Sequence, residues 1–460
     1  MTDYRPDPAI LTLGPDFYDP VAPADFPQAI LRFRNDRAAA SVGLEGLADD
    51  AWIRHFGRFE GLPDNLPEPL ALRYHGHQFR SYNPEIGDGR GFLFAQLRDG
   101  ADRLMDLGTK GSGRTPYSRF GDGRLTLKGG VREVLATEML EALGVDTSQT
   151  FSLIETGEAL ERGDEPSPTR AAVLVRLQHS HIRIGTFQRL AYFEETENLT
   201  KLTDYCLAHY YGGGDGGPGA LLDHVSRETA RLAASYIAAG FVHGVLNSDN
   251  IAITAQSFDY GPWRFTPFWD GGFTAAYFDH TGLYAFGRQP EAIHWNLVQL
   301  AASLRSIAPA EALTPALEAF PERFQDSLVA AIFRRLGLRP METERDAALL
   351  VALEEALAAK TVEIDHFFFD WRGGARRGPS PADDAYAGPE FAGWKRALEG
   401  YEAVPNALAH AYWSDDSPCS MHIDEVEAIW SRIDTDDDWS TLHAKVAAVR
   451  RMGEAHAAPA

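Results

Sequence analysis

Short runs rich in apolar and β-branched residues mark the first part of the chain and predict strands. Residues 91–98 and 102–110 are two such runs, and the turn-forming sequence Asp-Gly-Ala lies between them. This arrangement predicts a β-hairpin. Similar runs at 150–154 and 171–177, separated by a loop at 163–168 rich in Gly, Pro and charge, predict two further strands.

Helical spacing of apolar residues appears between these strands and dominates after them. Apolar residues recur every three or four positions from Val131 to Leu143, and Gly144 follows, where a helix commonly ends. Helical patterns at 199–211 and 221–239 flank a glycine-rich stretch at 212–219. Further helical patterns are found at 294–307, 309–337 and 343–360. We therefore expect an α+β fold, with a mostly-β lobe that contains one helix followed by a mainly α lobe.

The two ends of the chain have their own patterns. The first 70 residues mix short apolar runs with many prolines, so we expect an irregular arm laid over a domain. Residues 372–388 are rich in Gly, Pro, Ala and charge and predict a linker. Residues 389–452 predict a last helical segment.

Charge and cysteine content narrow the function. The 460 residues hold 43 Lys and Arg against 66 Asp and Glu, a net charge of −23 that opposes nonspecific binding of nucleic acid or an anionic membrane. No apolar run approaches the roughly 18 residues of a membrane span, so we expect a cytoplasmic protein. Two distant cysteines, Cys206 and Cys419, predict neither a disulfide framework nor a zinc site.

One polar segment resembles the catalytic loop of kinases. The sequence from His243 to Asn250 is followed by an apolar run and then by Asp259-Tyr260-Gly261. Kinase-type enzymes have a metal-binding Asn in this loop and a second metal-binding Asp in such a triplet. Asn250 and Asp259 would supply hard oxygen ligands for Mg²⁺ and leave the rest of its shell to phosphate and water.

The usual catalytic Asp of this loop is missing. Val245 occupies the position five before Asn250 and can accept no proton, which argues against ordinary kinase chemistry. Asp249 is the nearest carboxylate and is our candidate base. The alternative is that the segment is a polar turn between a helix and a strand, with Asp and Asn making local hydrogen bonds.

A second pair of residues strengthens the interpretation. Lys110 ends a predicted strand and Glu133 lies on the helix that follows, in the order in which kinase-like folds place their Lys–Glu pair. Lys110 would then meet a phosphate. Taken singly, both residues could also be ordinary solvated charges.

Glycine-rich loops and arginines could complete a phosphate site. Gly87-Asp88-Gly89-Arg90 and the loop containing Asp122 and Gly123 could bring backbone N–H groups close to phosphate oxygens. Arg176 lies at the end of a predicted strand and Arg183 shortly after it, and both could reach the same phosphate site. These loops could equally be simple turns, and the arginines surface ion-pair partners.

Together these motifs resemble the selenoprotein O family of kinase-like protein adenylyltransferases. The resemblance covers about residues 75–300 and weakens afterwards. The matching stretches are Gly76-His77-Gln78-Phe79, Tyr82-Asn83-Pro84, Gly87-Asp88-Gly89-Arg90, Thr115 to Arg124, His243 to Asn247 with Asp249-Asn250, and Asp259-Tyr260-Gly261-Pro262. Arg80, Ser81 and Ser248 depart from the residues that the family usually has at these positions.

The resemblance implies a fold, a reaction and a role for each candidate. The fold would be bilobal and pseudokinase-like, holding ATP flipped so that AMP passes to Ser, Thr or Tyr hydroxyls of proteins and pyrophosphate leaves. Asp249 would accept the proton, and Asn250 and Asp259 would hold Mg²⁺ or Mn²⁺. The nucleotide site would comprise Gly87, Gly89, Arg90, Lys110, Asp122, Gly123, Arg176, Arg183 and Asp259, with Glu133 paired to Lys110.

The corresponding division of the chain has four parts. We expect an N-terminal arm at 1–74, a nucleotide-binding lobe at 75–178, a lobe with the catalytic and metal-binding loops at 179–371, and a linker with a helical extension at 372–460. Three alternatives stay open: transfer of the γ-phosphoryl group, transfer of UMP from UTP, and nucleotide binding without catalysis by a scaffold protein.

Overall fold

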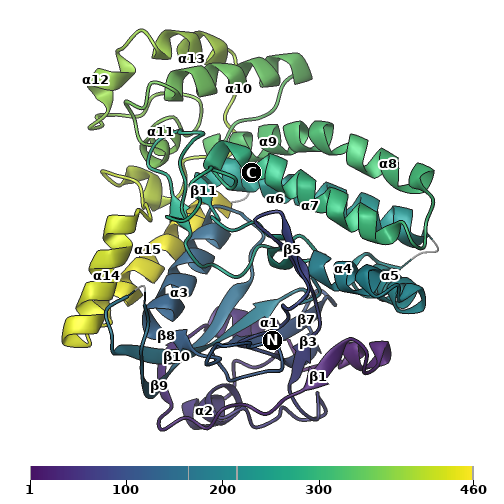
Figure 1. Cartoon of the computed structure of the whole chain (residues 1–460). Coiled ribbons are helices and arrows are strands. Elements are labelled where there is room, and N and C mark those ends of the chain that lie inside the picture. Colours follow the sequence, from purple (N-terminus) through teal and green to yellow (C-terminus); the bar gives the residue numbers. More distant parts are fainter. Residues whose placement is uncertain (1, 164, 214–215, 458–460) are drawn as a thin grey trace.

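A strongly paired antiparallel sheet forms one side of the molecule in the computed structural model, which describes residues 2–163, 165–213 and 216–457 (Figure 1). Its strand order is β1-β3-β6-β7-β10-β9-β2, and β8 pairs with β10. The strands are β1 (Tyr18–Pro20), β2 (Ile30–Arg34), β3 (Leu70–Leu72), β6 (Leu93–Arg98), β7 (Leu104–Lys110), β8 (Leu125–Thr126), β9 (Gln149–Leu160) and β10 (Thr169–Gln178).

The strands predicted from the sequence are present. The predicted hairpin is the pair β6 and β7, in which Leu97 lies opposite Met105. The next two predicted strands are β9 and β10, which pair along most of their length. Residue 164 of the loop between them lies outside the described residues.

The prediction of irregular structure is wrong for much of the first 70 residues. Strands β1 and β3 pair with each other, and β2 forms the opposite edge of the sheet by pairing with β9. Helices α1 (Asp36–Ser41) and α2 (Asp49–Gly57) lie between them in sequence, and Trp52 of α2 is fully buried against the ring of Phe151. Pro20 is the last residue of β1, and Pro69 comes directly before β3.

Helix α3 (Leu127–Ala142) is the predicted helix of the β-rich part. It begins at Thr126, whose side chain accepts a hydrogen bond from the N–H of Gly129. The helix is buried on most sides because the sheet covers one face and the C-terminal helices α14 (Ile423–Asp436) and α15 (Ser440–Ala457) cover another (Figure 1). Arg450 of α15 pairs with the buried carboxylate of Glu138.

The other side of the molecule is helical. Its helices are α4 (Ile184–Tyr192), α5 (Thr196–Tyr210), α6 (Gly217–Ala239), α7 (Gln289–Leu304), α8 (Ala310–Glu318), α9 (Phe320–Leu336), α10 (Thr343–Leu357), α11 (Ile364–Asp370), α12 (Asp383–Tyr386) and α13 (Phe391–Leu398). Residues 214–215 of the predicted glycine-rich stretch, and residues 458–460, lie outside the described residues.

Two helical predictions need correction. The pattern at 309–337 is two helices, α8 and α9, because Pro321 in the first turn of α9 has no N–H with which to continue a helix from α8. The predicted last helical segment is three helices, with an irregular stretch between α13 and α14. The predicted linker contains the short helix α12.

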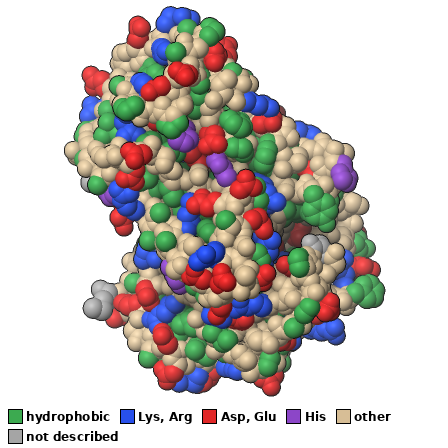
Figure 2. Space-filling model, turned by 90° about the vertical axis from the view of Figure 1, so that its left-hand side faces the viewer, with side chains coloured by type: hydrophobic (Ala, Val, Ile, Leu, Met, Phe, Trp, Pro, Cys, Tyr) green, Lys and Arg blue, Asp and Glu red, His purple; other side chains and the backbone are tan. Residues whose placement is uncertain are grey.

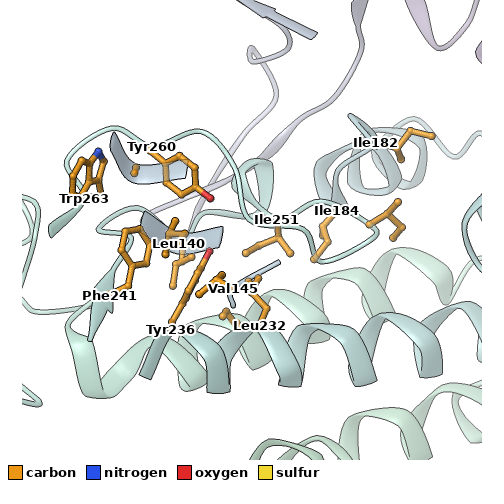
Figure 3. Packing of buried hydrophobic residues seen from close by; sticks show 14 of the residues in the cluster. Leu140, Val145, Ile182, Ile184, Leu232, Tyr236, Phe241, Ile251, Tyr260 and Trp263 are labelled. Atoms are coloured by element: carbon orange, nitrogen blue, oxygen red, sulfur yellow. The ribbon is translucent and has the colours of Figure 1, made fainter. Parts of the chain in front are cut away.

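A cluster of buried apolar side chains packs the helical side against the segments around Asp249 and Asp259. Tyr236 of α6, Phe241, Tyr260 and Trp263 pack together at one end of it, and Ile251 lies towards the other (Figure 3). The hydroxyl groups of Tyr236 and Tyr260 both bond to Ser257. This packing fixes the backbone on both sides of Asp259.

One face of the molecule shows how the surface charges are distributed. On the face that carries α14 and α15, acidic and basic side chains are intermixed (Figure 2). Among the described residues, no helix is long and apolar enough to cross a membrane. The mixed architecture agrees with the expected α+β class, whereas the kinase-like relationship and the four-part division stay predictions.

Candidate functional site

A cavity of about 720 Å³ collects positive charge on this acidic chain. Seven cationic side chains and five carboxylates line it. The cations are Arg90, Lys110, Arg119, Arg124, Arg162, Arg176 and Arg183, and the acids are Asp88, Asp122, Glu161, Asp249 and Asp259. Because the whole protein carries −23, this local excess of cations points to an anionic ligand.

Lys110 lines the cavity and pairs with two carboxylates. It is the last residue of β7, is buried, and forms an ion pair with Glu133 of α3. Its Nζ also lies 2.7 Å from Oδ1 of Asp259. The predicted Lys–Glu pair is therefore present, and the sheet and α3 hold the ammonium group in place.

Asp259 is held as a carboxylate. Burial opposes its ionisation, but the positive charges of Lys110, Arg176, Arg90 and Arg183 outweigh burial and keep its pKa well below the usual range. Its backbone has a φ of 63°, an unusual value for a residue other than glycine. The buried rings on either side, Phe258 and Tyr260, stabilise this conformation.

Two arginines extend the positive region. Arg176 of β10 lies 3.7 Å from Asp259, and Arg183 before α4 lies 3.2 Å from Asp88. Both guanidinium groups stack over the ring of Phe258. Nη1 of Arg176 and Nε of Arg183 are buried without a hydrogen-bond partner within the described residues. These donors are available to an anion in the cavity.

Asp249 presents an unpaired carboxylate oxygen. It lies in a 3₁₀ turn, η2 (Ser248–Asn250), is 8% exposed, and its Oδ1 has no hydrogen-bond partner within the described residues. Burial raises its pKa to about 6. The backbone carbonyl of Asp249 accepts a hydrogen bond of 2.8 Å from Arg183. A buried oxygen left in this state is suited to accepting a proton from a bound molecule.

The conformation of this loop comes from contacts with a small hairpin, β4 (Gly76–Gln78) and β5 (Ser81–Asn83). The N–H of His77 donates to Oγ of Ser248 over 2.7 Å. The N–H of Phe79 donates to Oδ1 of Asn247 over 3.0 Å. The sequence motif is therefore fixed by residues far away along the chain.

Asn250 is oriented by its own loop. Its Nδ2 donates to the carbonyl of Val245 over 3.0 Å, so the amide oxygen is the atom that remains for a metal. Among the described residues, no three His, Cys, Asp or Glu side chains gather as a metal-holding group. An ion held by Asn250 and the ionised Asp259 would take its other ligands from phosphate and water, as Mg²⁺ commonly does.

The predicted glycines have a packing role. A Cβ on Gly87 would lie 2.5 Å from the ring of Tyr117, and one on Gly123, whose φ is +73°, would lie 2.3 Å from Gly113. A Cβ on Gly89 would lie 3.0 Å from the backbone carbonyl oxygen of Tyr117, a less tight position. These glycines let the loop after β7 fold closely against the segment before β6. Asp122 in this loop pairs with Arg162 over 2.8 Å.

The structure gathers nearly all of the predicted site residues around one cavity. Glu133 and Asn250 are not part of its lining; they lie next to Lys110 and Asp249, which are. Sequence reasoning missed Arg162, Tyr74, whose ring lies under Arg183, and Phe120, whose fully exposed ring stands on the glycine-rich loop. An aromatic residue flanked by glycines and arginines was the available signal for Phe120.

Comparison with known proteins gives a consistent family. The model of the family described as protein adenylyltransferase SelO matches residues 2–450, well beyond the 75–300 expected from the motifs. A protein nucleotidyltransferase YdiU from Synechocystis sp. is 43% identical over 467 residues, covering 95% of this chain and 96% of that protein. One from Gloeobacter violaceus is 43% identical over 461 residues, covering 97% and 95%. The chain therefore belongs to the SelO family of protein adenylyltransferases and is a protein nucleotidyltransferase.

Proposed function

We propose that this protein transfers AMP from ATP to hydroxyl groups of Ser, Thr or Tyr in other proteins, with release of pyrophosphate and with Mg²⁺ or Mn²⁺. One observation carries the proposal: three buried cations, Lys110, Arg176 and Arg183, lie in the same cavity as Asp249, whose carboxylate oxygen is unpaired. The buried cations suit binding of a triphosphate, and the carboxylate of Asp249 suits removal of a proton from a hydroxyl group.

The distribution of charge orients the nucleotide. The triphosphate carries nearly all of the charge of ATP, so it is drawn to the buried cations. The adenine ring of the nucleotide then points towards the exposed loop that carries Phe120 and Asp122. Stacking on an exposed aromatic ring is a common way to hold a nucleobase. This orientation supports the flipped nucleotide that the family resemblance implies.

The reaction follows from this placement. The hydroxyl oxygen of the acceptor protein forms a bond to the α-phosphorus, and Asp249 accepts the proton that this hydroxyl group loses. The bond between the α-phosphorus and the bridging oxygen breaks, and pyrophosphate leaves with the electron pair. Lys110 and Arg176 stabilise the charge on the leaving group, and Glu133 and Asp259 hold Lys110 in position. A base whose pKa is about 6 is ionised at neutral pH.

The metal would be held by Asn250 and Asp259. Their amide and carboxylate oxygens are the donors that Mg²⁺ and Mn²⁺ prefer. When bound, the ion supplies positive charge that offsets the charge developing on the phosphates. Within this chain, the low pKa of Asp259 keeps its carboxylate available as a ligand across the physiological pH range.

Intact mass spectrometry tests the proposal. The protein is incubated with dephosphorylated casein, ATP and either Mg²⁺ or Mn²⁺, and parallel samples receive UTP. We expect an AMP-sized adduct that requires the metal. A phosphate-sized adduct would show γ-phosphoryl transfer, and a UMP-sized adduct would show that UTP is the donor. Absence of any adduct together with nucleotide-induced thermal stabilisation would indicate a binding protein without catalysis.

A further inference from the structure

Three exposed aromatic side chains form a ridge beside the catalytic loop. Phe79 is 38% exposed, Tyr277 is 80% exposed and Phe278 is 40% exposed. The ring centroids of Phe79 and Phe278 are 5.8 Å apart, and those of Tyr277 and Phe278 are 5.0 Å apart. We call these three residues the aromatic ridge. Clustered exposed apolar side chains commonly mark a surface that binds another molecule.

Hydrogen bonds connect the ridge to the catalytic loop. Oδ1 of Asn247 accepts from the N–H of Phe79 and, over 2.6 Å, from the hydroxyl of Tyr284. The ring of Tyr284 also packs against the ring of Phe79, with centroids 5.1 Å apart. Asn247 is two residues from Asp249. The ridge is therefore attached to the loop that carries Asp249.

The turn that carries Phe79 has an unfavourable backbone. Phe79 and Arg80 join β4 to β5 with φ values of 49° and 63°, in a turn that normally takes Asn or Gly. Such conformations are unfavourable for residues other than glycine and persist where the surroundings hold them. Arg80 is held by Glu291, 2.9 Å away, and by the ring of Trp295. The structure thus maintains a bulky ring at this exposed position.

A hollow of about 550 Å³ adjoins the ridge at Tyr277. Small and polar residues line it, including Gly271, Gly272, Thr274 and Arg288. An extended polypeptide needs polar partners for its N–H and C=O groups and a separate surface for its apolar side chains. The hollow and the ridge offer these two environments side by side.

We propose that the aromatic ridge and its hollow bind the acceptor protein. The bound segment is extended and places a large apolar side chain close to the modified hydroxyl group, because the ridge is attached to the loop that carries Asp249. This inference rests on the proposed function and adds to it the class of acceptor sequence. We assign the acceptor protein to this surface because hydrogen bonds join the ridge to the catalytic loop.

A peptide library tests the inference. Nine-residue peptides with a central Ser carry one variable residue at each flanking position and Gly or Ala elsewhere, and AMP incorporation from ATP is measured by mass spectrometry. We expect Leu, Met, Phe or Tyr within three residues of Ser to raise kcat/KM at least tenfold over Gly. The double variant Tyr277→Ala, Phe278→Ala should lose this preference while its KM for ATP stays unchanged.

A matched control is the double variant Met341→Ala, Leu408→Ala, which removes two apolar side chains that are each 45% exposed and lie outside the ridge and its hollow. It should keep the wild-type preference. AMP transfer without any apolar preference, or a preference that survives loss of the ridge, would overturn the inference and leave the proposed function intact. Absence of AMP on every peptide would count against both. A wild-type dimer that becomes monomeric in the ridge variant would make the ridge a self-association surface and overturn the inference.

Discussion

The substitution Asp249→Asn is expected to stabilise the protein while removing its catalytic base. The asparagine side chain has nearly the shape of aspartate but carries no charge and accepts no proton at neutral pH. In the wild-type protein, Oδ1 of Asp249 is buried without a hydrogen-bond partner, within the part of the chain that the structure describes. The substitution therefore removes a poorly solvated charge at little steric cost.

The magnitude follows from the pKa of Asp249. Burial raises it from 3.8 to about 6. At about 1.4 kcal/mol per pKa unit, ionised Asp249 lowers the free energy of unfolding by about 3 kcal/mol at pH 7. Because the folded state keeps its proton longer than the unfolded state, stability falls as pH rises from about 4 to about 6 and then levels off. Asp249→Asn should gain up to about 3 kcal/mol at pH 7 and nothing below pH 4.

Catalysis should change in the opposite direction. Loss of a general base commonly lowers a rate by about 10² to 10⁴. Nucleotide affinity should not weaken, because Asp249 contacts Arg183 through its backbone carbonyl, which the substitution preserves. The expected result is a low kcat together with unchanged or tighter binding of ATP.

Urea denaturation between pH 4 and pH 8, with EDTA and without nucleotide, measures the stability effect free of bound cations. Asp326→Asn, at an exposed position on α9, is the control and should change stability little. A variant less stable than the wild type at pH 7, or a stability difference independent of pH, would refute the electrostatic reasoning. AMP transfer within tenfold of wild type would refute the role of Asp249 as base.

Three further substitutions test other parts of the site and fold. Asp259→Asn should reduce AMP transfer below detection by intact mass spectrometry, because it removes the carboxylate that faces the buried cations; a clear adduct would contradict its assignment. Phe120→Ala should raise the KM for ATP about tenfold through loss of one stacking contact of about 1 to 2 kcal/mol, and Phe120→Trp should restore it; equal KM values would exclude contact with the base. Arg450→Ala should destabilise the protein by about 3 kcal/mol in urea denaturation, since it leaves the buried carboxylate of Glu138 unpaired. Arg451→Ala, at an exposed pair on the same helix, should change stability little, and similar effects of the two variants would contradict this reasoning.

Elements with a clear local pattern could be predicted from the sequence. The hairpin β6–β7 and helix α3 have apolar residues at the spacing of a strand or a helix over a whole element, and such spacing is a local property. Strands β1, β2 and β3 escaped prediction because each is short and gains its stability by pairing with a distant strand. The division of 309–337 into two helices was visible in Pro321 but was outweighed by the continuous apolar pattern.

The candidate site divides in the same way. The sequence alone determined which residue types are available: the motifs contain Lys110, Glu133, Asn250 and Asp259, and Val245 replaces the expected base. Only the tertiary structure decided that Lys110 contacts both Glu133 and Asp259, and that one oxygen of Asp249 is buried without a partner within the described residues. Chemistry is carried by side chains that a sequence pattern can reveal, whereas burial, pKa and the neighbours of each charge depend on segments that meet only when the chain folds.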